Sequence, residues 1–502
     1  MPYSAPIQNF PSGTTLFGPG TTALLFASLL FGAVAFGLVA ASANPVLFAI
    51  ALGALVGTML LAKPSWNITL ILALGLLVAG LLPIWFDAYT SKASWGVSLL
   101  TFTLLGATLF TLLSQPESAR NTPAFVWLAA LFFLYAIATT LLQWYSAPEF
   151  LGAFKRYFQA SGLLFALTWL RIPANNISRW RSFLLVVALL QLPFALYELI
   201  YLVPIRQRFV AFDPGLVPID IVSGTFGGHL YGGGANAEMA TFLILVLGFL
   251  LARFREKQLR LKRLLLIAPF LLIPLFLGET KIVVILLPML FLVLYRRELV
   301  SRPHYAIIAL VVAAILTFSA ATAYVAVTKK QSLDSLIETT LRYNVYEKGY
   351  GGNYLNRTTV LTFWADRQGA HNPVSMLLGN GLGSSHDGTN GHVAMEYPRH
   401  GIGLTAASTI LWDLGAFGAL LFLSILLTAW WTADKLQQKT QQPWVRADAA
   451  AIQASLPIFA VYLVYRLALL ETLSFQIVFS SLLGYLAWLH RNHSQAPFGR
   501  PE

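Results

Sequence analysis

The chain has 502 residues, of which 57% are hydrophobic and only 11% are charged. A soluble globular domain carries about 25% charged residues, so this composition is typical of an integral membrane protein. The chain contains no Cys, which excludes disulfides, thiolate catalysis and Cys-ligated metals. The net charge of +12 is explained by basic cytoplasmic loops, so no nucleic-acid partner is expected.

Apolar runs near the length that crosses a bilayer recur along the chain after an uncharged polar tail at 1–20, which does not resemble a cleavable signal peptide. The run 157–170 is short and suits a re-entrant or tilted helix, and 454–489 suits either two spans or one long broken helix. The predicted spans are 21–41, 45–62, 68–86, 96–114, 124–143, 157–170, 182–203, 237–253, 264–278, 282–296, 306–328, 404–429, 454–470 and 473–489. We therefore predict an all-α polytopic membrane protein with about 12–14 transmembrane helices.

Four short loops concentrate positive charge and set the predicted orientation. They contain Arg171, Arg179 and Arg181; Arg253, Arg255, Lys257, Arg260, Lys262 and Arg263; Arg296, Arg297 and Arg302; and Lys435, Lys439 and Arg446. Alternation of the spans places all four loops on one side, which the positive-inside rule assigns to the cytoplasm. Both termini are then cytoplasmic, and segments 204–236 and 329–403 lie outside, on the periplasmic face if the protein is bacterial.

The segment 329–403 is the longest polar stretch and is predicted to form one partly helical periplasmic loop. Five of the eight His in the chain lie in the two outer segments, at positions 229, 371, 386, 392 and 400. The long loop also carries Lys329, Lys330, Arg342, Lys348, Arg357, Arg367 and Arg399. Positive charge on the outer face runs against the orientation rule, which indicates a functional demand for it.

Three motifs organise the long loop. The sequence NRTTVLTFW, 356–364, predicts a helix with Asn356 as its N-cap and Arg357 in its first turn. The Gly-rich sequence LLGNGLGSS, 377–385, suits either close backbone approach to a ligand or an ordinary tight turn, and it is not a P-loop. The sequence YPRHGIG, 397–403, puts Arg399 and His400 where the chain re-enters the membrane, as interfacial polar residues or as part of a catalytic site.

Further charged residues lie near the predicted outer membrane edge. Glu279 and Lys281 interrupt an apolar stretch, and they form either a solvated ion pair or a cation site for an anionic lipid-linked ligand. Asn236 is predicted as a helix N-cap after the Gly-rich sequence SGTFGGHLYGGGAN. Arg466 and Glu471 are predicted to pair with each other inside the bundle.

The order of SGTFGG, ETK, NRTTVLTFW, LLGNGLGSS, a His before the next helix, and LWDLGAFGALLFL resembles the O-antigen ligase/polymerase superfamily. These are bacterial membrane glycosyltransferases of surface-polysaccharide assembly, with a GT-C-like helical fold. The resemblance covers residues 200–430. It implies transfer of a glycan from undecaprenyl diphosphate to an acceptor glycan or to lipid A core, without a cofactor or a required metal. A chain-length regulator and a flippase are the implied protein partners, beside the membrane lipids.

The resemblance also implies roles for individual residues. His400 matches the family's essential His and would act as the catalytic base, while Arg357, Lys281 and Arg399 would bind the donor diphosphate. Secondary candidates for this site are His392, His386, Arg342, Arg206, Arg208, Lys155 and Arg156. Lys281 stands where the family usually has Arg, and Lys lacks the bidentate geometry for phosphate. Direct displacement with one such base would invert the anomeric centre.

The implied domain organisation has three parts: amino-terminal helices 1–200, a ligase/polymerase-like core 201–430, and carboxy-terminal helices with a tail, 431–502. An exopolysaccharide or O-antigen polymerase is the favoured activity, with an O-antigen ligase as the alternative within the family. A polysaccharide or lipid-glycan flippase is the alternative from another class. A flippase needs polar residues along a central path, and the predicted spans before residue 180 offer few.

Overall fold

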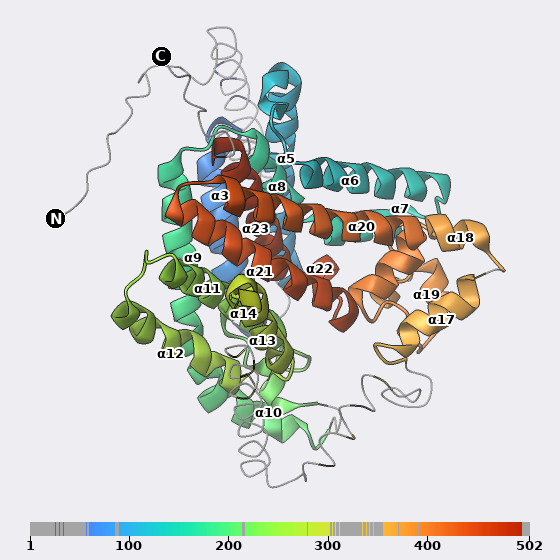
Figure 1. Ribbon diagram of the computed structural model, residues 1–502. Coiled ribbons are helices and arrows are strands. Elements are labelled where there is room, and N and C mark those ends of the chain that lie inside the picture. Colours follow the sequence, from blue (N-terminus) through green and yellow to red (C-terminus); the bar gives the residue numbers. More distant parts are fainter. Residues whose placement is uncertain are drawn as a thin grey trace. The chain divides into compact units, whose positions relative to one another are not determined.

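The computed structural model (Figure 1) describes residues 60–85, 90–212, 216–278, 280–301, 355–369, 371–389 and 391–493, with single positions between 26 and 57 and between 304 and 345. Most of the predicted spans 21–41, 45–62 and 306–328 lie outside the described residues, as do Glu279 and Arg342. The chain divides into two compact units, Met1–Trp66 and Asn67–Glu502.

The regular elements of the described residues are helices, apart from an isolated bridge between Gly228 and Gly234. The first half contains α3 (Pro64–Ala73), η1 (Leu74–Val78), α4 (Leu82–Trp85), α5 (Thr90–Ser114), η3 (Pro116–Ala119), α6 (Ala124–Leu142), α7 (Ala147–Phe158), α8 (Ser161–Trp169), α9 (Ala174–Tyr197), η4 (Glu198–Leu202), α10 (Val203–Phe209), η5 (Pro218–Ile221) and η6 (Gly224–Phe226). The second half contains α11 (Asn236–Arg255), α12 (Leu261–Leu277), α13 (Val283–Leu294), α14 (Arg296–Ser301), α17 (Thr359–Gln368), α18 (Pro373–Leu378), η7 (Asp387–Thr389), α19 (His392–Glu396), α20 (Ala406–Lys439), α21 (Pro443–Tyr465), α22 (Ala468–Glu471) and α23 (Leu473–His493).

Eight helical segments among the described residues are long and apolar enough to cross a membrane. They are Pro64–Ile84, Ser94–Ser114, Ala124–Leu142, Ala174–Phe209, Asn236–Arg255, Ala406–Lys439, Pro443–Tyr465 and Leu473–His493. These segments confirm the all-α polytopic class, and the larger total of about 12–14 helices remains a prediction. The pair 454–489 forms two helices, α21 and α23, separated by the short α22.

Helices α11, α21 and α23 form the centre of the bundle. In the apolar stretch of each of them 72–78% of the residues are buried, compared with 28–56% in the other five segments. Helix α20 packs along α21 and α6, and α11 packs on α21, α12 and α13 (Figure 1). The peripheral helices keep large apolar side chains exposed, such as Leu113, Leu134 and Leu142. That pattern suits a helix whose outer face contacts lipid.

The predicted span 157–170 is a short buried helix, α8, that follows α7. Its nine residues reach about 14 Å at 1.5 Å per residue, which is half of a bilayer's hydrocarbon core. Helix α8 is buried from Gly162 to Trp169 and packs between α5 and α23. Gly162 permits this packing, because a Cβ there would overlap the backbone of Thr101 on α5.

The four basic loops meet at one end of the bundle, as the sequence predicts. Ion pairs between them join Arg181 and Arg253 to Asp448, Arg296 to Asp434, and Arg446 to Glu256. Helices α11 and α20 end there and α21 begins there. At the opposite end α11, α20 and α23 begin, and α21 ends. The two ends of the same helices are therefore chemically distinct.

Candidate functional site

A polar cavity of about 500 Å³ lies at the end of the bundle that is remote from the basic loops. We call it the polar cavity throughout. Its walls come from the Gly-rich loop before α11, the first turn of α11, the turn before α17, and the segment between α21 and α23. Its main polar lining residues are His229, Glu238, Arg357, Tyr465, Arg466, Glu471 and Thr472, beside Gly227, Gly228, Gly233 and Gly234.

Arg466 stands at the carboxyl end of α21 and reaches back to α11. Its Nη1 lies 3.1 Å from Oε2 of Glu238, and it also donates to the carbonyl of Gly234. The attraction of the Glu238 carboxylate raises the pKa of Arg466 above its ordinary value, so this guanidinium is a fixed positive charge. The prediction that Arg466 pairs with Glu471 is wrong, because its partner is Glu238. Helix α21 ends at Tyr465, and the extended backbone of Arg466 turns its side chain toward α11.

Arg357 lies in the turn before α17. Asn356 caps this turn, since its Oδ1 accepts hydrogen bonds from the amides of Thr358 at 2.9 Å and Thr359 at 2.7 Å. The helix begins at Thr359, so the predicted place of Arg357 inside the first helical turn is wrong by two residues. Its Nε donates to the carbonyl of Tyr465 at 2.6 Å, and its guanidinium lies 4.4 Å from the centre of the Tyr465 ring. Tyr465, the last residue of α21, therefore binds Arg357, and the next residue is Arg466. The two guanidiniums lie on one wall of the polar cavity.

Glu471 lies on another part of the wall and gathers three of the predicted secondary residues. Its Oε1 lies 3.1 Å from Nε2 of His386. Burial raises the pKa of Glu471, but His386, Arg156 and Lys155 outweigh burial and lower this pKa below its ordinary value. Burial, assisted by Arg156, lowers the pKa of Lys155 to about 8. The carboxylate of Glu471 therefore remains ionised at neutral pH, in the field of Arg156 and Lys155.

His400 does not line the polar cavity. Its ring stacks on Phe363 at 5.3 Å, and its Nδ1 donates to the carbonyl of Pro398 at 3.2 Å. That bond makes Nε2 the basic nitrogen of the neutral ring. The His400 carbonyl accepts from the amide of Leu355 at 3.1 Å, two residues before Arg357. This backbone hydrogen bond connects the predicted catalytic His400 to the segment before α17 that contains Arg357.

His392 begins α19 and is bound by a buried carboxylate on α7. Its Nδ1 lies 3.0 Å from Oε1 of Glu149, and its amide donates to the other carboxylate oxygen at 3.2 Å. The ring stacks on Tyr145 with centroids 4.7 Å apart. A carboxylate at Nδ1 orients an imidazole and leaves Nε2 as the nitrogen that can accept a proton. His392 does not line the polar cavity.

The remaining predicted cations do not line the polar cavity. Arg399, Arg208 and Lys281 are exposed. Arg206 is 1% exposed and donates to the carbonyl of Gly232 at 2.5 Å, so it fastens the Gly-rich loop that forms one cavity wall. Burial raises the pKa of Asp220, and Arg206, Arg466 and Lys281 oppose that rise.

The Gly-rich turn 377–385 packs against a break in helix α20 and forms hydrogen bonds with the backbone there. At Gly415, whose φ is +67°, the backbone leaves the helical conformation. The amides of Asn380 and Gly381 donate to the freed carbonyls of Trp412 at 3.0 Å and Asp413 at 2.9 Å. Backbone groups of a membrane helix need such internal partners, because hydrocarbon supplies none.

The same turn surrounds the buried carboxylate of Asp413. This carboxylate accepts hydrogen bonds from the amides of Gly383 and Ser385, each at 3.0 Å, and from Ser384 Oγ and Tyr157 Oη, each at 2.9 Å. The structure therefore supports the tight-turn interpretation of this motif rather than a ligand cradle. The sequence LWDLG, 411–415, indicates such a site, because it places the ionisable Asp413 inside an apolar run and close to Gly415.

No family model matches the chain, and no curated protein sequence matches it. What the described residues define is a class: an all-α polytopic membrane protein with a guanidinium-lined polar cavity at one end of its bundle.

Proposed function

We propose that the chain is a membrane glycosyltransferase that moves a glycan from undecaprenyl diphosphate to an acceptor glycan at the periplasmic face of a bacterial inner membrane. The observation that carries this proposal is the pair of guanidiniums, Arg357 and Arg466, on one wall of the polar cavity. The cavity also lies at the end of the helices away from the basic loops, which the positive-inside rule assigns to the non-cytoplasmic side.

The two guanidiniums suit the diphosphate of the donor. Arginine binds phosphate through parallel N–H donors, and fixed cations stabilise the charge that develops on a departing diphosphate. Arg466 replaces Lys281 and Arg399 in this role, because both of those side chains are exposed and do not line the cavity. The Gly-rich loop 227–235 forms another wall, where Gly227, Gly228, Gly233 and Gly234 present backbone without side chains and leave room for a sugar diphosphate.

The transfer is a single displacement at the anomeric carbon. The hydroxyl oxygen of the acceptor forms a bond to that carbon, and its proton passes to Nε2 of His400. The bond from the anomeric carbon to the diphosphate oxygen breaks, and undecaprenyl diphosphate leaves with the electron pair. Arg357 and Arg466 stabilise its charge. Attack opposite the leaving group inverts the anomeric configuration.

His392 is the second candidate for the base. The specific observation in its favour is the 3.0 Å contact between Nδ1 and Glu149, because a carboxylate at Nδ1 fixes the orientation of the ring and leaves Nε2 to accept a proton. The two candidates are distinguished by the variants His400→Ala and His392→Ala. The turnover of each variant at saturating donor is compared with that of the wild-type protein. The variant that loses turnover by about a hundredfold identifies the base.

The test of the activity uses the purified full-length protein with a lipid-diphosphate-linked oligosaccharide. Longer lipid-linked glycans indicate a polymerase, and glycan on added lipid A core indicates a ligase. Arg357→Gln is expected to lower transfer by about a hundredfold, while Arg120→Gln, on an exposed side chain, serves as the matched control. Transport of the donor across proteoliposomes without any glycan transfer would instead establish the flippase alternative and overturn the proposal.

A further inference from the structure

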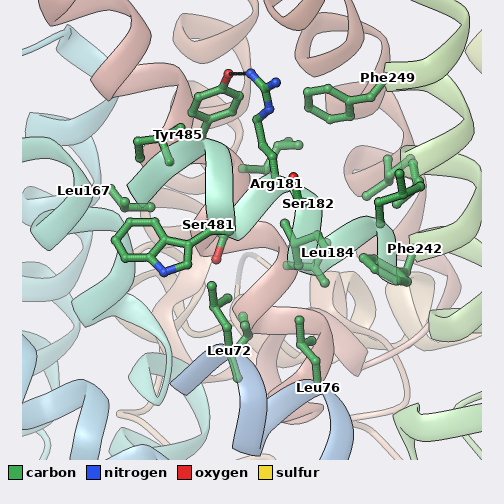
Figure 2. Close-up of a pocket in the computed structure, with 18 of the residues that line it drawn as sticks. Leu72, Leu76, Leu167, Arg181, Ser182, Leu184, Phe242, Phe249, Ser481 and Tyr485 are labelled. Carbon is green, nitrogen blue, oxygen red and sulfur yellow. Dashed lines mark hydrogen bonds between the residues drawn. The ribbon is translucent and has the colours of Figure 1, made fainter. Parts of the chain in front are cut away.

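A second cavity, of about 210 Å³, lies inside the bundle between α3, α8, α9, α11 and α23. Its walls are almost wholly apolar, with Leu72, Leu76, Leu167 and Phe242 among the lining residues (Figure 2). We call it the apolar cavity. An apolar space of this size takes a hydrocarbon segment in preference to water, because water needs polar partners.

One end of the apolar cavity is cationic. Arg181 and Arg253 line it there, and both bind the buried carboxylate of Asp448, at 3.1 and 2.9 Å. Arg181 Nη1 also lies 3.3 Å from the hydroxyl of Tyr485. Two guanidiniums face one carboxylate, so this group carries a net charge of +1. About a quarter to a third of each Arg side chain stays exposed, which leaves surface for an anion.

A hydroxyl marks the boundary between the cationic end and the apolar walls. Ser481 lies one helical turn before Tyr485 on α23, and Figure 2 shows it between the Arg181 end and the leucines Leu72 and Leu76. Its Oγ is buried and has no hydrogen-bond partner among the described residues. A buried hydroxyl without a partner is costly, so an acceptor from a bound molecule suits this position.

The length of the apolar cavity matches one leaflet of a bilayer. Phe242 and Arg253 both line it and lie eleven residues apart on α11, about 16 Å along the axis at 1.5 Å per residue. The hydrocarbon core of a bilayer is about 30 Å thick, so one leaflet supplies about 15 Å. Cation, hydroxyl and apolar walls thus follow one another in the order of headgroup, ester and acyl chain.

We propose that the apolar cavity binds one acyl chain of an anionic glycerophospholipid from the leaflet at the basic end of the bundle. The lipid phosphate contacts Arg181 and Arg253, an ester carbonyl accepts from Ser481 Oγ, and the acyl chain lies between α3 and α11. Basic pockets between transmembrane helices are known sites for anionic lipid headgroups. This lipid is distinct from any donor, whose diphosphate would sit at the opposite ends of the same helices.

The test uses the full-length protein in bilayer discs of equal phosphatidylglycerol and phosphatidylethanolamine, released for native mass spectrometry. Wild-type protein is expected to retain one phosphatidylglycerol at least about fivefold more often than phosphatidylethanolamine. Arg181→Gln is expected to remove that preference while Arg253 keeps Asp448 paired. Arg446→Gln, at the same end but outside the cavity, is expected to keep it.

A second variant tests the apolar walls. Ser481→Phe fills the space and is expected to abolish retention of the lipid, whereas Leu131→Phe, on an exposed position of α6, is the matched control and is expected to retain it. Equal retention of the two lipids by wild-type protein, or unchanged retention in Arg181→Gln, would overturn the proposal. Preferential retention of a polyprenyl phosphate, lost in Ser481→Phe, would overturn it as well, because the occupant would then be the donor's tail.

Discussion

Tyr465 positions both guanidiniums of the polar cavity. Its carbonyl accepts from Arg357, its ring lies 4.4 Å beneath the Arg357 guanidinium, and its neighbour along the chain is Arg466. Removing the ring leaves the carbonyl bond in place but deletes a cation–π contact. We expect Tyr465→Ala to raise the KM for the lipid-linked donor by about three- to tenfold with little change in kcat.

Tyr465→Phe is the control for that prediction, because phenylalanine keeps the aromatic face and should leave the donor KM near its original value. Equal effects of the two variants would show that the hydroxyl, rather than the ring, matters. A fall in kcat at constant KM would show that the Tyr465 ring supports Arg357 in stabilising the departing diphosphate rather than in binding the donor.

Lys155 provides a pH-dependent contribution to stability. Burial, with Arg156 adding to it, lowers its pKa in the folded protein from 10.5 to about 8. Between these two values the unfolded chain holds a proton that the folded protein has released, so stability rises with pH across this interval. We expect Lys155→Met to raise the Tm at neutral pH and to flatten its increase between pH 8 and 10.5.

The measurement is thermal unfolding in detergent as a function of pH. Lys435→Met removes an exposed lysine from α20 and should follow the wild-type pH dependence. If Lys155→Met keeps the full rise in Tm above pH 8, the lysine ammonium is not the group that titrates.

Individual side-chain partners were the part of the site that the sequence predicted least well. Arg466 and Glu471 are five residues apart and of opposite charge, which favoured a local pair. The backbone at Arg466 is extended, with φ −153° and ψ 163°, so the two side chains leave the chain in different directions. Glu238 and His386, their partners, are far away in sequence, and only the packing of α11 and the long loop brings them there.

At the scale of helices, the break in α20 depends on one residue. Gly415 has φ +67°, and a Cβ there would overlap the backbone of Leu377 and Gly379 in the Gly-rich turn. We expect Gly415→Ala to destabilise the protein by about 2–4 kcal/mol, from the left-handed conformation and the overlap together. The fall in Tm in detergent measures this cost.

Gly106→Ala is the matched control, since Gly106 lies in α5 and a Cβ there meets nothing within 4 Å. Alanine favours a helix more than glycine does, so this variant should be unchanged or more stable by about 0.5–1 kcal/mol. A Gly415→Ala protein as stable as wild type would mean that α20 can close into a continuous helix without the Gly-rich turn.

Helices were predicted well where apolar runs were long, because a bilayer-length run leaves few alternatives to a helix. The predicted spans 124–143 and 237–253 agree with α6 and α11 to within two residues. The short run 157–170 contains the last two residues of α7 and the whole of α8, which packs against α5 and α23 instead of crossing the bilayer, because an apolar helix can be buried against protein as well as against lipid. Hydropathy alone cannot distinguish these two surroundings.

The Gly-rich turn shows a second limit of prediction at this scale. Its sequence predicts close backbone approach but does not say what approaches. The partner is Asp413 on α20, twenty-eight residues after Ser385, and the pattern of amides around a carboxylate appears only when both segments are folded. A single Asp within LWDLG was the available signal for this contact.

At the scale of the molecule, the charge pattern was the most informative feature of the sequence. Loops far apart in the chain were predicted to share one side, and Asp448 binds Arg181 from one loop and Arg253 from another. The carboxylates that join these loops also limit their mutual repulsion. The orientation of this basic end in the membrane connects both proposals, because it decides which leaflet each cavity faces.

The absence of Cys from the chain allows a direct test of that orientation. Tyr231→Cys places one thiol in the exposed Gly-rich loop at the polar cavity, and Gln258→Cys places one in a basic loop. Retention of basic loops in the cytoplasm predicts that a membrane-impermeant maleimide labels only the Tyr231→Cys variant in intact spheroplasts. The Gln258→Cys variant should become labelled after permeabilisation or in inverted vesicles.

Reversed labelling would place the polar cavity in the cytoplasm, where a periplasmic glycan donor could not reach it, and the proposed transfer would fail. It would also move the cationic end of the apolar cavity to the outer leaflet. The native-mass-spectrometry result would then still stand, because selection between two headgroups depends on charge at Arg181 and Arg253 rather than on the side they face. The labelling experiment therefore tests the proposed function and leaves the lipid site to its own measurement.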